Sequence, residues 1–189
     1  AVVNIPVIED KLLVRFAGEI VDRDGYTKDI TFNKDRDDKH YWTGRLGVTW
    51  RPTDKIENYL MAYNTWSRNN GPGLVGQGFN LDIFGGPYFQ CATASCSEYQ
   101  SLVDAQKARG PREIALSVDE FSKIETWGVT DTLDFQLTDN LALRNIASYA
   151  ELKNYFSSDS DGFDSPTYDD NPFTARSIPR DNFKQYSEE

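Results

Sequence analysis

YWTGRLGVTWRPTDKIENYLMAYNTW, at residues 41 to 66, decides the fold of this chain. Two runs of about ten residues alternate in character on either side of a short Pro/Asp turn, which predicts a tight β-hairpin. Successive side chains of a strand point to opposite faces, so the first run has one apolar and one polar face. The apolar set is Trp42, Gly44, Leu46, Val48 and Trp50, and the polar set is Thr43, Arg45, Gly47, Thr49 and Arg51.

An amphipathic strand of this kind fits two architectures. In a soluble sandwich the apolar face meets a core, whereas in an outer-membrane barrel it meets lipid and the polar face lines the lumen. Trp42 and Trp50 stand at the two ends of the apolar row, and barrels carry aromatic girdles at both membrane interfaces. We therefore favour the barrel, with Trp42, Trp50 and, on a later strand, Trp127 as the interface aromatics.

Composition narrows the class of protein further. The 189 residues are 26% charged and 13% aromatic, and the mean hydropathy is -0.60, so apolar residues are concentrated in short alternating runs. No stretch approaches the roughly 18 apolar residues of a transmembrane helix, which excludes a helical membrane protein. A net charge of -10 without a basic face argues against a nucleic-acid partner.

The same alternation recurs along the chain and predicts an all-β, antiparallel, up-and-down transmembrane barrel segment of about five or six strands. Thr138, Asp139 and Asn140 form a second short turn. The expected strands are residues 1–8, 11–26, 42–51, 58–68, 126–137 and 141–156, and the closing FKQYSEE opens another.

Charged residues on the polar face of these strands are the candidate lumen lining. Arg15 and Glu19 alternate with apolar neighbours, as Arg45 and Arg51 do in the hairpin. A solvated sheet face is the alternative interpretation. Asp131 falls on the apolar parity of its strand, where a carboxylate in lipid would cost a few kcal/mol, so a bulge, a partner or a rim position is required.

The connections fall into two classes. Short turns suit the periplasmic side of a barrel, and long polar loops suit its extracellular side. Ser95 with Glu98 forms a capping box and Gly110 begins a stop signal, which predicts a short loop helix over residues 97–109. The expected long loops are residues 26–41, 74–125 and 157–182.

The two cysteines, Cys91 and Cys96, permit one small-loop disulfide in an oxidising compartment, or two free thiols. Their spacing and the absence of nearby histidine argue against zinc.

Three other patterns are weak. His40 has no partner constellation and is expected to be a solvated loop residue. Gly71, Gly73 and Gly76 spell a GxGxxG without a following helix, which favours a flexible loop. Asp159, Asp161 and Asp164 fail the full calcium-loop spacing, which favours a hydrated acidic loop.

Three phrases together resemble the β-barrel region of TonB-dependent outer-membrane receptors. They are NIPVIEDKLLVRFAGEIVDRDGY at 4–26, DDKHYWTGRLGVTWRPTDKIE at 37–57 and WGVTDTLDFQLTDNLALRNIASY at 127–149. The resemblance covers nearly the whole chain apart from the interior of the longest loop. It implies a barrel of about 22 strands, closed by an N-terminal plug domain, that imports a scarce ligand such as a ferric siderophore.

The chain departs from that family by omission. It shows no plug domain and no TonB box, so we expect residues 1–189 to be part of a receptor barrel domain, a piece of a longer protein. The resemblance implies outer-membrane lipid, the plug and the TonB complex as partners, an unidentified small ligand, and the outer membrane of a Gram-negative bacterium. We expect no catalytic residue, metal or cofactor. The alternative is a soluble secreted β-sandwich or carbohydrate-binding module, whose aromatics would gather in one stacking platform.

Overall fold

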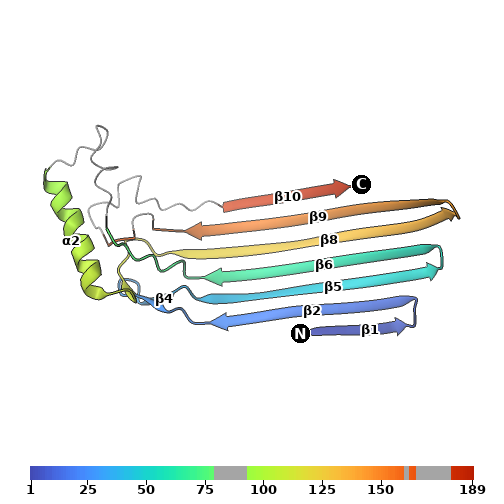
Figure 1. Ribbon diagram of the computed structural model, residues 1–189, viewed down its shortest axis with the longest axis horizontal. Coiled ribbons are helices and arrows are strands. Elements are labelled where there is room, and N and C mark those ends of the chain that lie inside the picture. Colours follow the sequence, from blue (N-terminus) through green and yellow to red (C-terminus); the bar gives the residue numbers. More distant parts are fainter. Residues whose placement is uncertain (79–92, 160–161, 165–179) are drawn as a thin grey trace.

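The computed structural model describes residues 1–78, 93–159, 162–164 and 180–189. Most of these form one open antiparallel sheet, here called the main sheet, in which strands follow one another in chain order (Figure 1). Its seven strands exceed the five or six predicted, and the hairpin at residues 41–66 is confirmed. The strands are β1 (Val2–Ile8), β2 (Leu12–Arg23), β5 (Lys39–Thr53), β6 (Ile56–Asn69), β8 (Phe121–Thr138), β9 (Leu141–Ser157) and β10 (Arg180–Glu188).

A smaller three-stranded sheet and one helix stand at one end of the main sheet (Figure 1). The prediction that residues 26–41 are loop is wrong in part, because they contain two of these strands and the start of β5. The helix begins earlier than predicted, so Ser95 lies inside it and is not its cap. The elements are β3 (Thr27–Asp29), β4 (Lys34–Arg36), α2 (Thr93–Arg109) and β7 (Glu113–Ile114).

Short turns and long connections lie at opposite ends of the main sheet. Tight turns join β1 to β2, β5 to β6 and β8 to β9 at one end. The small sheet and α2 belong to the long connections at the other end (Figure 1). This separation matches the predicted division between short turns and long loops.

The main sheet is a single layer among the described residues. Among the described residues, the buried apolar side chains all lie in the connections and not in the main sheet. They are Val103, Ile114, Ala115, Leu116 and Phe163. A β-sandwich buries one face of each sheet against a second sheet. The described part of the chain contains no such second layer over the main sheet, which weighs against the sandwich alternative.

One close approach fixes the packing of side chains on the main sheet. Tyr63 on β6 lies directly opposite Gly128 on β8, and a Cβ at Gly128 would lie 2.7 Å from the tyrosine ring. The ring therefore occupies the space that the missing side chain leaves. Gly44 on β5 differs, since a Cβ there would meet only Trp42, at 4.0 Å.

These two glycines give a matched test of the packing. We expect Gly128→Ala to lower the free energy of unfolding by about 1–3 kcal/mol, because the added methyl displaces the Tyr63 ring. Gly44→Ala should be neutral or should stabilise by up to about 1 kcal/mol, because it only restricts the unfolded chain. Denaturant titration of both variants measures the difference, and equal effects would contradict this account of Tyr63.

Candidate functional site

The strand register sorts the main sheet into two chemically different faces. Residues directly opposite each other on antiparallel strands share a face. Trp42 pairs with Trp66, and Trp50 and Trp127 stand in other rows on the same side, which we call the tryptophan face. The opposite side, called the arginine face, carries the four predicted lumen residues Arg15, Glu19, Arg45 and Arg51. Whether it lines a lumen remains a prediction.

Large apolar side chains on the tryptophan face are open to their surroundings. Leu46 is 43% exposed and Trp50 is 52% exposed, while Val48 is half-buried. Soluble proteins rarely expose apolar patches beyond a few hundred Å². The arginine face exposes fewer such residues, namely Val2, Tyr59, Ile124 and Phe183, whereas the tryptophan face exposes Val3, Ile5, Phe16, Ile20, Trp42, Leu46, Trp50, Leu60, Trp127, Leu143 and Tyr186.

Aromatic residues form an oblique line across the tryptophan face. Trp42 and Trp66 share a row on β5 and β6, and that row continues through Glu125, Lys153 and Asn182. The aromatic residue of each later strand lies nearer the short turns than this row. Trp127 is displaced by two residues on β8, and Tyr149 and Tyr186 are displaced by four on β9 and β10.

The line is continuous where it crosses the last strands. The rings of Trp127 and Tyr149 have centroids 5.0 Å apart, and those of Tyr149 and Tyr186 lie 4.7 Å apart. Both distances are in the range of attractive aromatic pairs. We call Trp42, Trp66, Trp127, Tyr149 and Tyr186 the aromatic line.

The short turns step in the same direction as the aromatic line. Taking the row of Trp50 as reference, the β1–β2 hairpin ends in that row, at Leu12. The β5–β6 hairpin ends at Thr53 and Ile56, two to three residues beyond the row. The β8–β9 hairpin ends at Thr138 and Leu141, four to five residues beyond it. The turns and the aromatics therefore follow two nearly parallel lines.

Sequence reasoning found part of this arrangement and missed part. It identified Trp42, Trp50 and Trp127, which lie on the tryptophan face. It placed Trp66 within the expected strand 58–68 but not among the interface aromatics, and Trp66 lies in β6 opposite Trp42. It also missed Tyr149 and Tyr186. The alternation within the 41–66 hairpin carried the signal for Trp66, since a tight turn fixes which residues stand opposite.

Asp131 has the partner that the sequence required. Its Oδ1 accepts a hydrogen bond of 2.8 Å from the amide of Asn58, which also stands on the tryptophan face. Around Asp131 the pairing with β6 and β9 is regular, without a bulge. The side-chain amide therefore offsets part of the cost of placing a carboxylate on an apolar face.

Two further residues that the sequence analysis singled out, Arg51 and His40, also have defined neighbours. Arg51 donates from Nε to Glu57 Oε2 at 2.5 Å. His40 stands at the start of β5 rather than in a loop, so its predicted placement is wrong. Its Nδ1 contacts Asp22, and its Nε2 lies 3.1 Å from Asp38 Oδ2.

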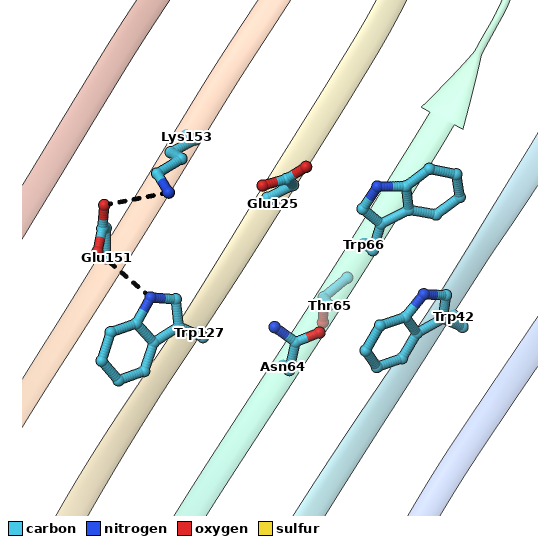
Figure 2. A pocket seen from close by; sticks show the side chains of 8 residues that line it. All are labelled: Trp42, Asn64, Thr65, Trp66, Glu125, Trp127, Glu151 and Lys153. Atoms are coloured by element: carbon cyan, nitrogen blue, oxygen red, sulfur yellow. Dashed lines mark hydrogen bonds and ion pairs between the residues drawn. The ribbon is translucent and has the colours of Figure 1, made fainter.

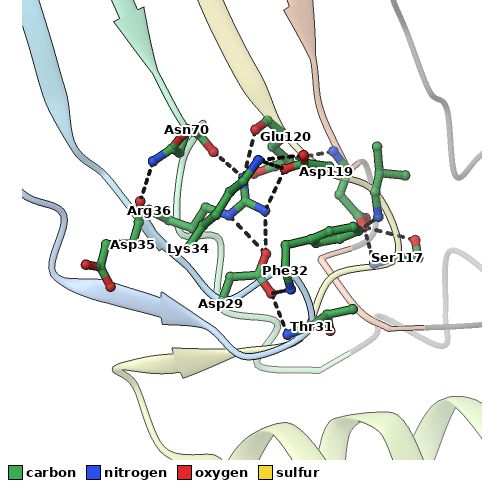
Figure 3. Close-up of polar contacts among 12 residues, drawn as sticks. Asp29, Thr31, Phe32, Lys34, Asp35, Arg36, Asn70, Ser117, Asp119 and Glu120 are labelled. Carbon is green, nitrogen blue, oxygen red and sulfur yellow. Dashed lines mark hydrogen bonds and ion pairs between the residues drawn. The ribbon is translucent and has the colours of Figure 1, made fainter.

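A buried polar cluster joins the long connections beyond the main sheet (Figure 3). Arg36 on β4 is fully buried and donates from Nε to Asp29 Oδ2 at 3.0 Å, with a second contact from Nη2. Its Nη1 also donates to the backbone carbonyls of Asn70 and Glu120, the latter at 2.8 Å. Arg36 thus ties the first long connection to both ends of the second.

The third long connection joins this cluster through Asp159. Its backbone N–H donates to Glu120 Oε1 at 2.7 Å, and its Oδ2 accepts from the backbone N–H and hydroxyl of Ser117, both at 3.0 Å. Asp159 is only 2% exposed, so the prediction of a hydrated acidic loop is wrong for this residue. We call Asp29, Arg36, Asn70, Glu120 and Asp159 the loop hub.

Several predicted features are not built into a site. Gly71, Gly73 and Gly76 lie in irregular chain after β6, as the loop interpretation predicted. Cys91 lies outside the described residues, as does Asp161, so neither the disulfide nor the full acidic motif is described. Among the described residues, no three His, Cys, Asp or Glu side chains are grouped to hold a metal.

In the part of the chain that the structure describes, no helix has the length and apolar character needed to cross a membrane. Comparison with known protein families, curated proteins and solved structures finds no match to this chain.

Glu120 makes the stability of the loop hub depend on pH. Burial raises the pKa of its carboxyl from 4.5 to about 7, because the hydrogen bond from Asp159 and the charge of Arg36 offset only part of the desolvation, and Asp159 and Asp29 add repulsion. The folded state therefore binds this proton more tightly than the unfolded state. Its stabilising contribution is complete below pH 4.5 and is lost as pH rises through about 7.

We expect amide-exchange protection of residues 113–120, corrected for intrinsic rates, to fall between pH 5 and pH 8. The loss should correspond to at most about 3 kcal/mol. Glu120→Gln should abolish this dependence, because the amide does not titrate. Asp35→Asn, at an exposed position beside the cluster, should retain it. The same pH profile in Glu120→Gln and in the unmodified chain would rule out Glu120 as its source.

Proposed function

We propose that this chain forms part of the wall of a transmembrane β-barrel in the outer membrane of a Gram-negative bacterium. The tryptophan face would contact lipid, and the arginine face, with Arg15, Glu19, Arg45 and Arg51, would line the interior. The observation that carries the proposal is the aromatic line, which runs obliquely across five strands and parallel to the short turns.

The slope of this line is that of a barrel strand in a membrane. From Trp42 to Tyr186 the line shifts by four residues over four strand spacings. At about 3.4 Å per residue and about 4.8 Å per spacing, the slope is roughly 35°. Strands of outer-membrane barrels are tilted by about 35–45°. A girdle lying level in a membrane would therefore cross these strands at the observed slope.

The width of the band agrees with a bilayer as well. Trp42 and Thr53 are eleven positions apart along β5, and Trp127 and Thr138 are eleven positions apart along β8. A tilted strand needs about 9–11 residues to cross a membrane. Trp50 supplies an aromatic residue near the turn-side boundary. β8 continues for six residues beyond Trp127, where charged Glu125 and Lys123 replace the apolar ones.

Lipid also accounts for the exposed apolar face. Each fully exposed side chain of this size forgoes about 1.5–3 kcal/mol of burial energy. Hydrocarbon would cover the tryptophan face without a second protein layer. The edge strands β1 and β10 would need to pair with further strands, because unpaired backbone groups are costly in lipid.

Within this class we propose a TonB-dependent receptor, on the resemblance of the three phrases in residues 4–26, 37–57 and 127–149. The long connections would lie outside the cell and meet a scarce ligand such as a ferric siderophore. Passage would require a plug domain and energy from the TonB complex. The proposed role is transport, without chemistry by this chain.

Charge substitution distinguishes a lipid face from a solvated one. We expect Leu46→Arg to destabilise the protein folded in bilayers, lowering its free energy of unfolding by about 2–4 kcal/mol, because it places a cation at mid-depth in lipid. Thr130→Arg stands at similar depth on the arginine face and should cost under about 1 kcal/mol. Unfolding titrations in liposomes, made on the complete barrel that contains these strands, measure both variants. A cost at Leu46 no greater than at Thr130 would refute the lipid assignment.

Uptake tests the receptor assignment separately. In an iron-limited host that carries this gene, deleting the gene should abolish energy-dependent uptake of one ferric chelate, and plasmid-borne expression should restore it. Deleting the TonB complex should reproduce the defect. Unchanged uptake of every chelate offered would contradict a role in iron import. It would not bear on the lipid face, which the charge substitutions test.

A further inference from the structure

A hollow of about 260 Å³ lies on the tryptophan face where the aromatic line crosses β5, β6 and β8 (Figure 2). Its volume is just below the roughly 300 Å³ at which small-molecule sites begin, so it suits a single ring rather than an extended chain. The lining residues are Trp42, Asn64, Thr65, Trp66, Glu125, Trp127, Glu151 and Lys153.

Three indole rings surround one amide at this hollow. Figure 2 shows Trp42 and Trp127 on either side of Asn64, with Trp66 next to Trp42. The flat faces of the three rings are turned toward the viewer. Trp42 is 44% exposed and Trp127 is 40% exposed, so their flat faces are accessible. Trp127 donates from Nε1 to Glu151 Oε2 at 3.3 Å, which orients its ring.

The polar groups of the hollow select for hydroxyls rather than for anions. Glu125 and Glu151 are carboxylates, which accept hydrogen bonds from hydroxyl groups and repel phosphate. Lys153 Nζ lies 3.6 Å from Glu151 Oε1 and offsets part of one negative charge. Flat aromatic faces beside hydroxyl acceptors suit a sugar ring, which has apolar C–H faces and a rim of hydroxyls.

The apolar band begins directly on the turn side of the hollow. Leu46, Ala62 and Val129 share one row, two strand positions closer to the turns than Asn64. A ligand with its ring in the hollow would therefore extend an alkyl chain over this row. We propose that the hollow binds the uncharged sugar headgroup of a glycolipid, with its acyl chain on Leu46, Ala62 and Val129. This inference rests on the proposed function for the source of the ligand.

The complete barrel that contains these strands, folded in dodecylphosphocholine micelles, provides the test, with the indole N–H signals of the four tryptophans of this chain assigned by single substitutions. Dodecyl maltoside is the probe. It should shift the signals of Trp42, Trp66 and Trp127 saturably and leave that of Trp50, which lies outside the hollow, unchanged. Tetraethylene glycol monododecyl ether has the same alkyl chain without a sugar and should produce less than a tenth of the shift.

Two variants and one further ligand complete the design. Trp127→Leu should raise the dodecyl maltoside concentration at half-saturation at least tenfold, whereas Trp50→Phe should leave that concentration unchanged. Free maltose at the same concentration should produce no shift, because it lacks the alkyl chain. Equal shifts with the ether, a shift of Trp50, or saturation by free maltose would each overturn the proposal. A cost at Leu46→Arg in liposomes would still support the lipid face in that case, so the two failures are distinguishable.

Discussion

The main sheet is held together within its own plane, and the rest of the structure depends on this constraint. Seven strands satisfy one another through backbone pairing, and the described residues place no second layer on either side. A sheet in this condition cannot stabilise its apolar face by internal burial, which is how soluble domains obtain most of their stability. In the proposed function, lipid covers the tryptophan face instead. The separation of tryptophans from arginines across the sheet would then place one face against an apolar medium and the other against a polar one.

The loop hub solves a different problem, that of ordering long polar connections without a large apolar core. Among the described residues, the connections bury five apolar side chains and one fully buried Arg36–Asp29 pair. A buried ion pair contributes little net stability because of desolvation, but it is strongly directional. Arg36 binds two backbone carbonyls in addition to Asp29, which leaves few alternative arrangements. The connections gain a defined geometry at the end of the sheet.

Local patterns were sufficient to predict the strands of the main sheet, two of its tight turns and the division between turns and long loops, because alternation and turn chemistry act over a few residues. The failures involve partners that are distant in the sequence. Asn58 and Asp131 are 73 residues apart, and Arg36 reaches Glu120 across 84. No local pattern marks such pairs. The charged run around Arg36 was typical of a solvated loop, and only its tertiary partners make it a buried element.

The steady stagger of the main sheet constrains the tilt of the strands in any ring that it helps to form. Strands offset by about one residue per neighbour accumulate, on a complete circuit, a total shear close to the number of strands. Such a ring has a tilt that does not depend on its circumference. These seven strands therefore specify an angle but no diameter, so the same wall geometry serves narrow and wide cylinders alike.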